Sequence, residues 1–360
     1  MPKTDWLLAA PMSATNSKAD TPLYPYLARL IRGEDLSLDE SADFFRVLIA
    51  RNANPAQIAG ALSALTAKGE TFEELAGMAG VMREKTLKIT TRQKNFIDLA
   101  GTGLSSAKTF NVSTAAAFVA AGAGLTVAKH ASRAGMSKTG SADVLDKLGV
   151  KVSGELEIAQ ACLNGAGICF MFAPKFHPAL RRVGDVRSSL GIRTCLNLLG
   201  VLSNPASAPK QLIGVWHPTL VEPMAQALAL LGTEKAWVVH GSDGLDEITL
   251  TGETFVAEVS NGKVKTFDIS PEDFGFQRGE IKHLKAKTPD QSADIIKEVL
   301  ASKRRDEARS LVVMNAAAAL VIGGITKEPM HAARLAEQSI DSHSAQVKLE
   351  RLIQTTNRHS

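Results

Sequence analysis

A glycine turn followed by a hydroxyl-rich segment carries the residues of this sequence best suited to binding a phosphorylated ligand. Gly101-Thr102-Gly103 follows an apolar run at 96–100, and Asn111–Thr114 then leads into an alanine-rich stretch. The pattern predicts a strand, a turn and the beginning of a helix, whose unpaired N–H groups and dipole attract anions. Glycine lets the backbone approach a phosphate closely, and a Ser or Thr hydroxyl can hold an accompanying metal ion.

Basic and titratable side chains follow a second apolar run, at 124–128. Lys129 and His130 come directly after it, Arg133 follows shortly, and Ser137–Ser141 forms another loop of Ser, Thr and Gly. A solvated loop is the plain alternative, but open α/β sheets bind ligands at the carboxyl ends of their strands. We therefore expect these cations to face a ligand.

Adjacent carboxylates occur after a third apolar run, at 236–240. Asp246 and Glu247 follow the turn 241–244. Mg²⁺ prefers a few carboxylates together with substrate phosphate oxygens, so this turn is a candidate metal site. A solvated acidic turn is the alternative.

Other motifs are excluded or weaker. The glycine turn is not a P-loop, since no Gly-Lys-Ser/Thr closes it, and Ser106 stands where a dinucleotide fingerprint needs its third glycine. His177 and His217 each precede a proline, which favours a structural role at a helix start. Arg187 lies in a helical stretch and could bind a carboxylate or phosphate in a bidentate manner. No serine lies in a nucleophile-elbow context, so no Ser/His/Asp triad is predicted.

Strand-like and helical segments alternate after residue 96, as in parallel α/β sheets. Strands are expected at 96–100, 124–128, 168–172, 236–240 and 311–314, and helices at 113–122, 141–149, 155–165, 218–232 and 290–302. The stretch 248–285 predicts a small antiparallel edge, and 179–202 breaks the alternation with a helical pattern.

The N-terminal part has only helical signals. Ser37–Glu40 is a capping box, Asn54-Pro55 begins another helix, and Thr71–Glu74 caps the next. The expected fold class is α/β, with a small discontinuous helical domain hinged to a larger α/β domain that has a mostly parallel sheet flanked by helices. The expected boundaries are an extension at 1–20, a helical domain at 21–92 joined by part of 179–210, and an α/β domain at 93–360.

Composition narrows the class of protein. The 360 residues are 45% hydrophobic and 22% charged, and a net charge of +4 does not suggest a nucleic-acid binder. The three cysteines are too widely spaced for a zinc site, and the N-terminus lacks the layout of a secretory signal. We expect a cytoplasmic protein that does not span a membrane.

Five blocks of the chain, in order, resemble one known family. They are 98–114 (DLAGTGLSSAKTFNVST), 129–149 (KHASRAGMSKTGSADVLDKLG), 172–178 (FAPKFHP), 186–206 (VRSSLGIRTCLNLLGVLSNPA) and 239–247 (VHGSDGLDE). Together they resemble the anthranilate phosphoribosyltransferase family, over nearly the whole chain. The resemblance implies Mg²⁺-dependent transfer of the phosphoribosyl group of phosphoribosyl pyrophosphate to the amine of anthranilate, with release of pyrophosphate, in tryptophan biosynthesis. It also implies a homodimer whose α/β domain binds phosphoribosyl pyrophosphate.

The resemblance assigns roles to individual residues. Lys129 and Arg187 are the expected catalytic residues, and Arg187 matches the arginine that meets the anthranilate carboxylate. Ser113, Asp246 and Glu247 match the Mg²⁺ ligands. The expected phosphoribosyl pyrophosphate site comprises Gly101, Thr102, Gly103, Leu104, Ser105, Thr109, Asn111, Val112, Ser113, Thr114, Lys129, Ser137 and Ser141. The expected acceptor site comprises Gly101, His130, Ser132 and Arg187.

The chain departs from the family pattern mainly near the acceptor. Leu104 and Ser105 replace Gly-Asp, Ala131 and Ser132 replace Gly-Asn, and Met136 replaces Ser. Two alternatives therefore stay open. One is a paralogue that uses a different aromatic amine. The other is a non-catalytic relative that binds nucleic acid or a nucleotide, against which the retained acidic pair and the modest net charge both argue.

Overall fold

The computed structural model describes residues 22–103, 105, 107–131, 139–152 and 154–358. They form two compact units, each made of two segments of the chain. The helical unit combines residues up to Thr86 with His177–Ser203, and the α/β unit combines Leu87–Phe176 with the chain from Asn204 onward. The expected fold class, with a discontinuous helical part, is confirmed. The extension expected at 1–20 lies outside the described residues.

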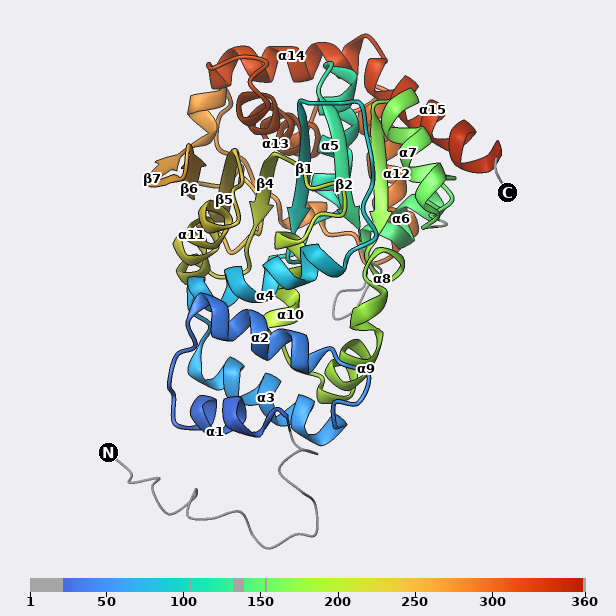
Figure 1. Cartoon of the computed structure of the whole chain (residues 1–360). Coiled ribbons are helices and arrows are strands. Elements are labelled where there is room, and N and C mark those ends of the chain that lie inside the picture. The colour runs from blue at the N-terminus through green and yellow to red at the C-terminus, as the bar shows by residue number, and fades with distance from the viewer. Residues whose placement is uncertain (1–21, 104, 106, 132–138, 153, 359–360) are drawn as a thin grey trace, which may run out of the picture. The chain divides into compact units, whose positions relative to one another are not determined.

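The helical unit begins its helices where the sequence supplies caps. It contains α1 (Tyr24–Ile31), α2 (Leu38–Leu48), α3 (Pro55–Lys68), α4 (Phe72–Lys85), α9 (Arg181–Leu190) and α10 (Cys195–Leu202) (Figure 1). The Ser37 and Thr71 side chains accept hydrogen bonds from the backbone N–H of Glu40 and Glu74, as the capping boxes predict. The Asn54 side chain caps α3 by accepting from the Ala56 N–H.

The α/β unit is built on a seven-stranded sheet with the order β3-β2-β1-β4-β5-β6-β7 (Figure 1). The strands are β1 (Phe96–Gly101), β2 (Thr126–Ala131), β3 (Ile168–Phe172), β4 (Lys210–Gly214), β5 (Lys235–Gly241), β6 (Thr254–Ser260) and β7 (Lys263–Ile269). Strands β1 to β5 pair in parallel, whereas β6 and β7 pair antiparallel, which confirms the expected antiparallel edge.

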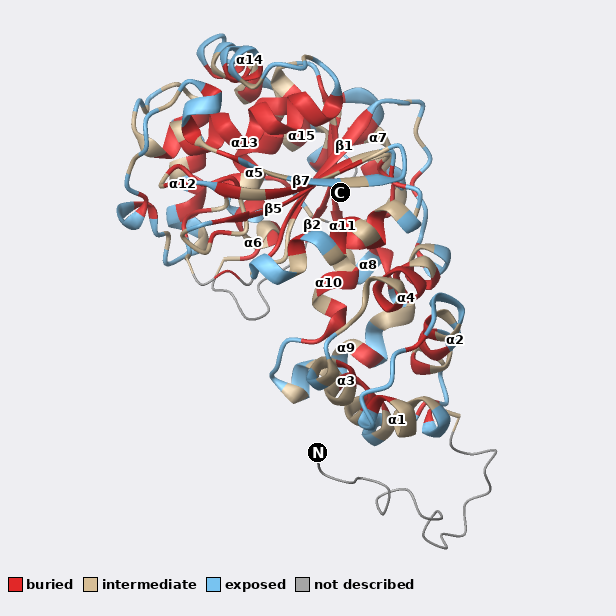
Figure 2. Cartoon of the chain, turned by 90° about the vertical axis from the view of Figure 1, so that its left-hand side faces the viewer, coloured by how far each residue is buried: buried red, intermediate tan, exposed pale blue. Residues whose placement is uncertain are grey.

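Helices cover both faces of this sheet. They are α5 (Val112–Gly122), α6 (Ser141–Lys147), α7 (Leu156–Gly165), α8 (Ala173–Phe176), α11 (Val221–Leu230), α12 (Pro289–Leu300), α13 (Glu307–Gly323), α14 (Pro329–Asp341) and α15 (Ser344–Arg358). Because parallel crossovers are right-handed and β1-α5-β2 runs opposite to β4-α11-β5, α5 and α11 lie on opposite faces. Helix α13 packs against α5 and is buried along almost its whole length (Figure 2). No helix among the residues described is long and apolar enough to cross a membrane.

Three expectations about the strands need correction. Residues 311–314 lie inside α13, because a helix buried on every side shows no amphipathic period and its branched run resembles a strand. Strand β4 was not predicted, because its sequence KQLIG begins with two polar residues and has only two large apolar ones. Strand β2 continues to Ala131, so Lys129 and His130 lie within the strand rather than after it.

Candidate active site at the carboxyl ends of the central strands

The candidate site lies where the order of the sheet reverses. From β1 the chain moves outward through β2 to β3, whereas β4 and β5 follow on the opposite side of β1. Open α/β sheets bind ligands in the crevice outside the carboxyl ends of the strands at such a point. The register pairs Gly101, at the end of β1, with Gly214, at the end of β4.

The acidic turn passes directly over these two glycines. A Cβ on Gly214 would lie 1.6 Å from the backbone oxygen of Asp246, and one on Gly101 would lie 3.2 Å from its Oδ2. The Gly103 N–H donates to Asp246 Oδ2 at 2.7 Å, and the Thr102 hydroxyl donates to the same oxygen at 3.3 Å. Glycine is needed at position 214 because any side chain there would displace the turn that carries the carboxylates.

Glu247 connects the same turn to the beginning of α5. The backbone N–H of Ser113, in the first turn of that helix, donates to Glu247 Oε1 at 3.1 Å. Burial raises the pKa of the Glu247 carboxyl well above its ordinary value, and the nearby Asp246 charge raises it further. A cation bound beside this buried carboxyl would favour its charged form.

Lys129 brings a buried cation to the same place. The residue is only 3% exposed, and its Nζ donates to the Leu99 carbonyl and, at 3.2 Å, to Ser113 Oγ. Burial lowers the pKa of Lys129, while the charges of Asp98, Glu247 and Asp246 oppose that shift. Lys129 therefore faces the acidic pair, whereas its strand neighbour His130 points to the opposite face of the sheet.

A small cavity joins the three expected metal ligands. Its lining includes Ser113, Asp246 and Glu247 together with Leu99, Gly214 and Asn315. A hydroxyl and two carboxylates fit Mg²⁺, which takes oxygen ligands and usually completes its shell with substrate phosphates. Among the residues described, no group of three or more His, Cys, Asp or Glu side chains could hold a metal ion alone.

Asn111 is anchored from a distant helix. Its N–H donates to Ser292 Oγ at 2.9 Å, Ser292 Oγ donates to Asn111 Oδ1 at 2.9 Å, and Asn111 Nδ2 donates to the Thr139 carbonyl at 3.3 Å. Thr139 lies two residues before Ser141, where α6 begins. The structure thus brings the Asn111 segment and the Ser141 segment together.

The other described residues of the expected phosphoribosyl pyrophosphate site are buried. Thr109 is buried and its hydroxyl donates to the Phe110 carbonyl, while Val112 and Thr114 have no exposed surface. The Thr114 hydroxyl has no hydrogen-bond partner among the described residues. Ser105 is also buried, and its hydroxyl donates to the Ala107 carbonyl. Leu104, Ser132 and Ser137 lie outside the described residues.

Sequence reasoning missed the residues that support the site from behind. The Asp98 carboxylate accepts hydrogen bonds from the His130 N–H at 3.0 Å and from Asn204 Nδ2 at 2.7 Å. Burial raises the pKa of Asp98 to about 6, although the Lys129 charge opposes the shift. Asn315 and Ser292 contribute from α13 and α12, in segments without a motif. A lone polar residue in an apolar helix is the one signal that could have indicated Asn315.

Arg187 belongs to the helical unit, on α9. It is half-buried, and no hydrogen bond or ion pair joins its guanidinium to another residue in the described part of the chain. Burial lowers the pKa of this guanidinium. A partly desolvated arginine of this kind is suited to binding an anion.

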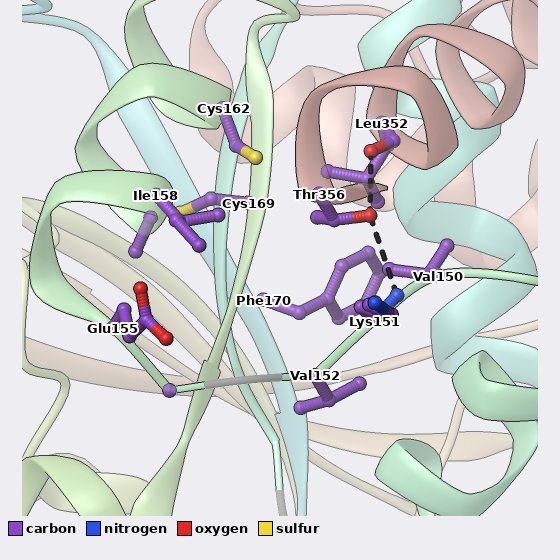
Figure 3. Close-up of a pocket in the computed structure, with 12 residues that line it drawn as sticks. Val150, Lys151, Val152, Glu155, Ile158, Cys162, Cys169, Phe170, Leu352 and Thr356 are labelled. Carbon is purple, nitrogen blue, oxygen red and sulfur yellow. Dashed lines mark hydrogen bonds between the residues drawn. The ribbon is translucent and has the colours of Figure 1, made fainter. Parts of the chain in front are cut away.

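A second cavity in the α/β unit is mainly apolar. It is lined by Val150, Lys151, Val152, Gly154, Glu155, Ile158, Ala159, Cys162, Cys169, Phe170, Leu352 and Thr356 (Figure 3). The Thr356 hydroxyl bridges the backbone there, accepting from the Lys151 N–H and donating to the Leu352 carbonyl. Burial raises the pKa of the Cys162 thiol to about 12, so this thiol is unreactive. The expected metal ligands line the other cavity.

Known proteins resemble both units. The a/b domain of a glycosyl transferase family matches residues 93–346, and its helical bundle domain matches residues 24–86. The chain is 46% identical over 330 residues to the anthranilate phosphoribosyltransferase of Desulfosudis oleivorans, covering 92% of this chain and 97% of that protein.

Solved structures agree with this likeness. The crystal structure of anthranilate phosphoribosyltransferase from Thermus thermophilus is 36% identical with a TM-score of 0.86, covering 92% of this chain and 99% of that one. The Saccharomyces cerevisiae enzyme in complex with phosphoribosyl pyrophosphate and Mg is 28% identical with a TM-score of 0.85, covering 95% and 99%. The chain therefore belongs to the anthranilate phosphoribosyltransferase family.

Proposed function

We propose that this protein transfers the phosphoribosyl group of phosphoribosyl pyrophosphate to the amine of anthranilate and releases pyrophosphate, a step of tryptophan biosynthesis. The observation that carries this proposal is the convergence of Ser113, Asp246, Glu247 and Lys129 at the carboxyl ends of the central strands. The family membership supports the same reaction, because the relatives are named for it.

The donor is held by the α/β unit. The turn Gly101–Gly103 and the beginning of α5 flank the acidic pair, and their N–H groups at Gly103 and Ser113 hold Asp246 and Glu247. The positive end of the α5 dipole would favour phosphate bound beside them. Ser113, Asp246 and Glu247 would hold Mg²⁺, which supplies charge neutralisation to the pyrophosphate when it is bound. Lys129 places a further positive charge beside Ser113, where negative charge develops on the leaving pyrophosphate as its bond to C1 of the ribose breaks.

The acceptor needs orientation more than activation. An aniline-type nitrogen is already unprotonated near neutral pH, so its lone pair can attack the electron-poor C1 without a strong base. Arg187 is assigned to the anthranilate carboxylate, because its guanidinium offers two parallel N–H donors to a planar anion. Gly101, His130 and Ser132 are assigned to the acceptor by their position in the family motifs, and Ser137 completes the donor loop in the same way.

Two further properties belong to the proposal. The family resemblance supports a homodimer. The three cysteines are free and buried, which suits the reducing cytoplasm in which we place the reaction.

The test is the loss of anthranilate fluorescence with phosphoribosyl pyrophosphate and Mg²⁺, run beside a pyrophosphate-release assay on a panel of aromatic amines. Rapid loss of anthranilate with matching pyrophosphate release supports the proposal. Release of pyrophosphate only with another amine would reject anthranilate as the acceptor and favour the paralogue.

The second candidate, a different amine acceptor, is favoured by one specific observation. Ala131 replaces a family glycine at the end of β2 and is only 2% exposed, so its methyl group occupies space inside the protein. The non-catalytic alternative has its own test. Labelled oligonucleotide is titrated across a series of salt concentrations. Clear binding at about 50 mM salt that weakens steeply as the salt rises would support the non-catalytic alternative.

A further inference from the structure

Helix α13 holds the backbone directly after the acidic pair through a two-point hydrogen-bonded clamp. The Ile248 N–H donates to Asn315 Oδ1 at 3.0 Å, and Asn315 Nδ2 donates to the Ile248 carbonyl at 2.9 Å. One side-chain amide thus pairs with both polar groups of one residue, as a neighbouring strand would. Ile248 follows Glu247 in the sequence and is itself 1% exposed, so solvent cannot readily replace these bonds.

The chemistry of the clamp requires an amide. The Asn315 Nδ2 has two N–H donors. One donates to the Ile248 carbonyl, and the other donates to the Leu311 carbonyl at 2.9 Å. The side chain is 3% exposed and α13 is buried around it, so its position is fixed by packing. An aspartate would keep the acceptor but would turn a charge toward two carbonyl oxygens. A leucine would fill the volume and leave the Ile248 groups unpaired.

The clamp lies beside the expected metal ligands. Asn315 lines the small cavity together with Ser113, Asp246 and Glu247. Asp246 and Glu247 in turn accept hydrogen bonds from the N–H groups of Gly103 and Ser113. The acidic turn is therefore held from two directions: by the segments of Gly103 and Ser113, and by α13.

We propose that Asn315 is a positioning residue that sets the place of the Asp246–Glu247 pair for metal binding. This inference rests on the proposed function, because it takes the acidic pair as ligands of Mg²⁺. Both polar atoms of the Asn315 side chain are already engaged by the backbone of Ile248 and Leu311. Asn315 acts through the backbone of Ile248. Its loss weakens the metal site, while the glycine turn Gly101–Gly103 stays in place.

The test measures metal binding without turnover. Mn²⁺ is titrated into the full chain with saturating pyrophosphate, by calorimetry, for the natural protein and for Asn315→Leu and Asn315→Asp. We expect the Mn²⁺ dissociation constant to rise about tenfold or more in both variants, as for residues that orient metal ligands. The control is Ser339→Ala, which removes another buried hydrogen bond of the same unit, to the Val119 carbonyl at 2.8 Å. It should bind Mn²⁺ within about twofold of the natural protein.

The outcomes separate the two proposals. If the natural protein does not bind Mn²⁺ with pyrophosphate, the metal assignment in the proposed function fails. If it binds and the Asn315 variants bind equally well, only the positioning role of Asn315 is overturned.

Hydrogen exchange in the natural chain covers the case in which the Asn315 variants do not fold. The Ile248 amide should exchange as slowly as the amides inside α13. Exchange as fast as that of the exposed turn residue Gly262 would show that the clamp does not hold the backbone, and would overturn the proposal.

Discussion

The donor side and the acceptor side of the proposed reaction differ in how their residues are held. On the donor side, Asp246, Glu247, Ser113 and Lys129 are bound to one another or to the neighbouring backbone. On the acceptor side, Arg187 has no such bonds within the described residues, and Ser132 lies outside them. Interlocked residues cannot change singly without leaving a buried partner unpaired, whereas separate ones can. This difference predicts that a single substitution costs more among the interlocked donor-side residues than at Arg187.

Removing the acidic pair should give the largest effect. Asp246→Ala with Glu247→Ala removes both carboxylates assigned to Mg²⁺ and should lower kcat by about a thousandfold or more. Pyrophosphate release at saturating substrates measures the loss. Asp268→Ala, an exposed carboxylate on β7, is the matched control and should retain full turnover. Unchanged turnover in the double variant would refute the role of the pair.

Replacing Lys129 should give the second largest loss of activity. Lys129→Met removes the buried cation beside Ser113 and should lower kcat by about a hundred- to a thousandfold, as the loss of a transition-state charge partner does elsewhere. Lys147→Met, on the exposed side of α6, controls for the change in net charge. A rise in KM for the donor at constant kcat would mean that Lys129 binds ground state and transition state equally.

Asp98 should make the stability of the α/β unit depend on pH. Burial raises the pKa of Asp98 from 3.8 to about 6, so the native state binds this proton more tightly than the unfolded state. The associated stability is complete below the unfolded pKa and is lost as the pH rises through the folded pKa. Relative to Asp98→Asn, the natural protein should lose up to about 3 kcal/mol of unfolding free energy between about pH 4 and pH 6.

Urea unfolding of both proteins at a series of pH values measures this difference. A constant difference across the range would show that Asp98 titrates as an ordinary carboxyl.

Arg187 should affect only the acceptor. Arg187→Ala removes a charged hydrogen-bond donor worth about 1.5–3 kcal/mol, which corresponds to a rise of about ten- to a hundredfold in KM for anthranilate. The KM for phosphoribosyl pyrophosphate should stay the same. Aniline, which lacks the carboxylate, is the matched substrate control, and the natural and variant proteins should use it equally. A shift in the donor KM instead would break the separation between the two sides.

The smallest expected effect concerns the altered loop. Restoring Gly at Ala131 together with Asn at Ser132 should lower KM for anthranilate by a few-fold, since a regained polar contact is worth about 1 kcal/mol. Initial rates over a range of anthranilate concentrations measure it. A higher KM would indicate a pocket shaped for another amine.

The features that the sequence could predict are local, whereas those that it could not predict depend on residues far apart in the chain. Caps such as Ser37 and Thr71 and the glycine turn at 101–103 are local, so their types and spacing predicted where the helices begin and where β1 ends. Asn315 and Asp98 act across long stretches of chain, through bonds to Ile248 and His130, and no local pattern marks such partners.

Fully buried elements are also difficult to recognise from sequence. Helix α13 has no polar face, so its run at 311–314 resembled a strand. Strand β4 reads KQLIG and has only two large apolar residues, so its sequence gave no clear strand pattern.

The most direct test of the proposed reaction follows both products of one reaction mixture. Anthranilate loss and pyrophosphate release are recorded together from the natural protein with phosphoribosyl pyrophosphate, in Mg²⁺ and again after chelation of the metal. We predict that anthranilate consumed and pyrophosphate released are equal in Mg²⁺, and that both rates fall to near zero after chelation. Pyrophosphate release without anthranilate loss, or equal rates without the metal, would contradict the proposed reaction.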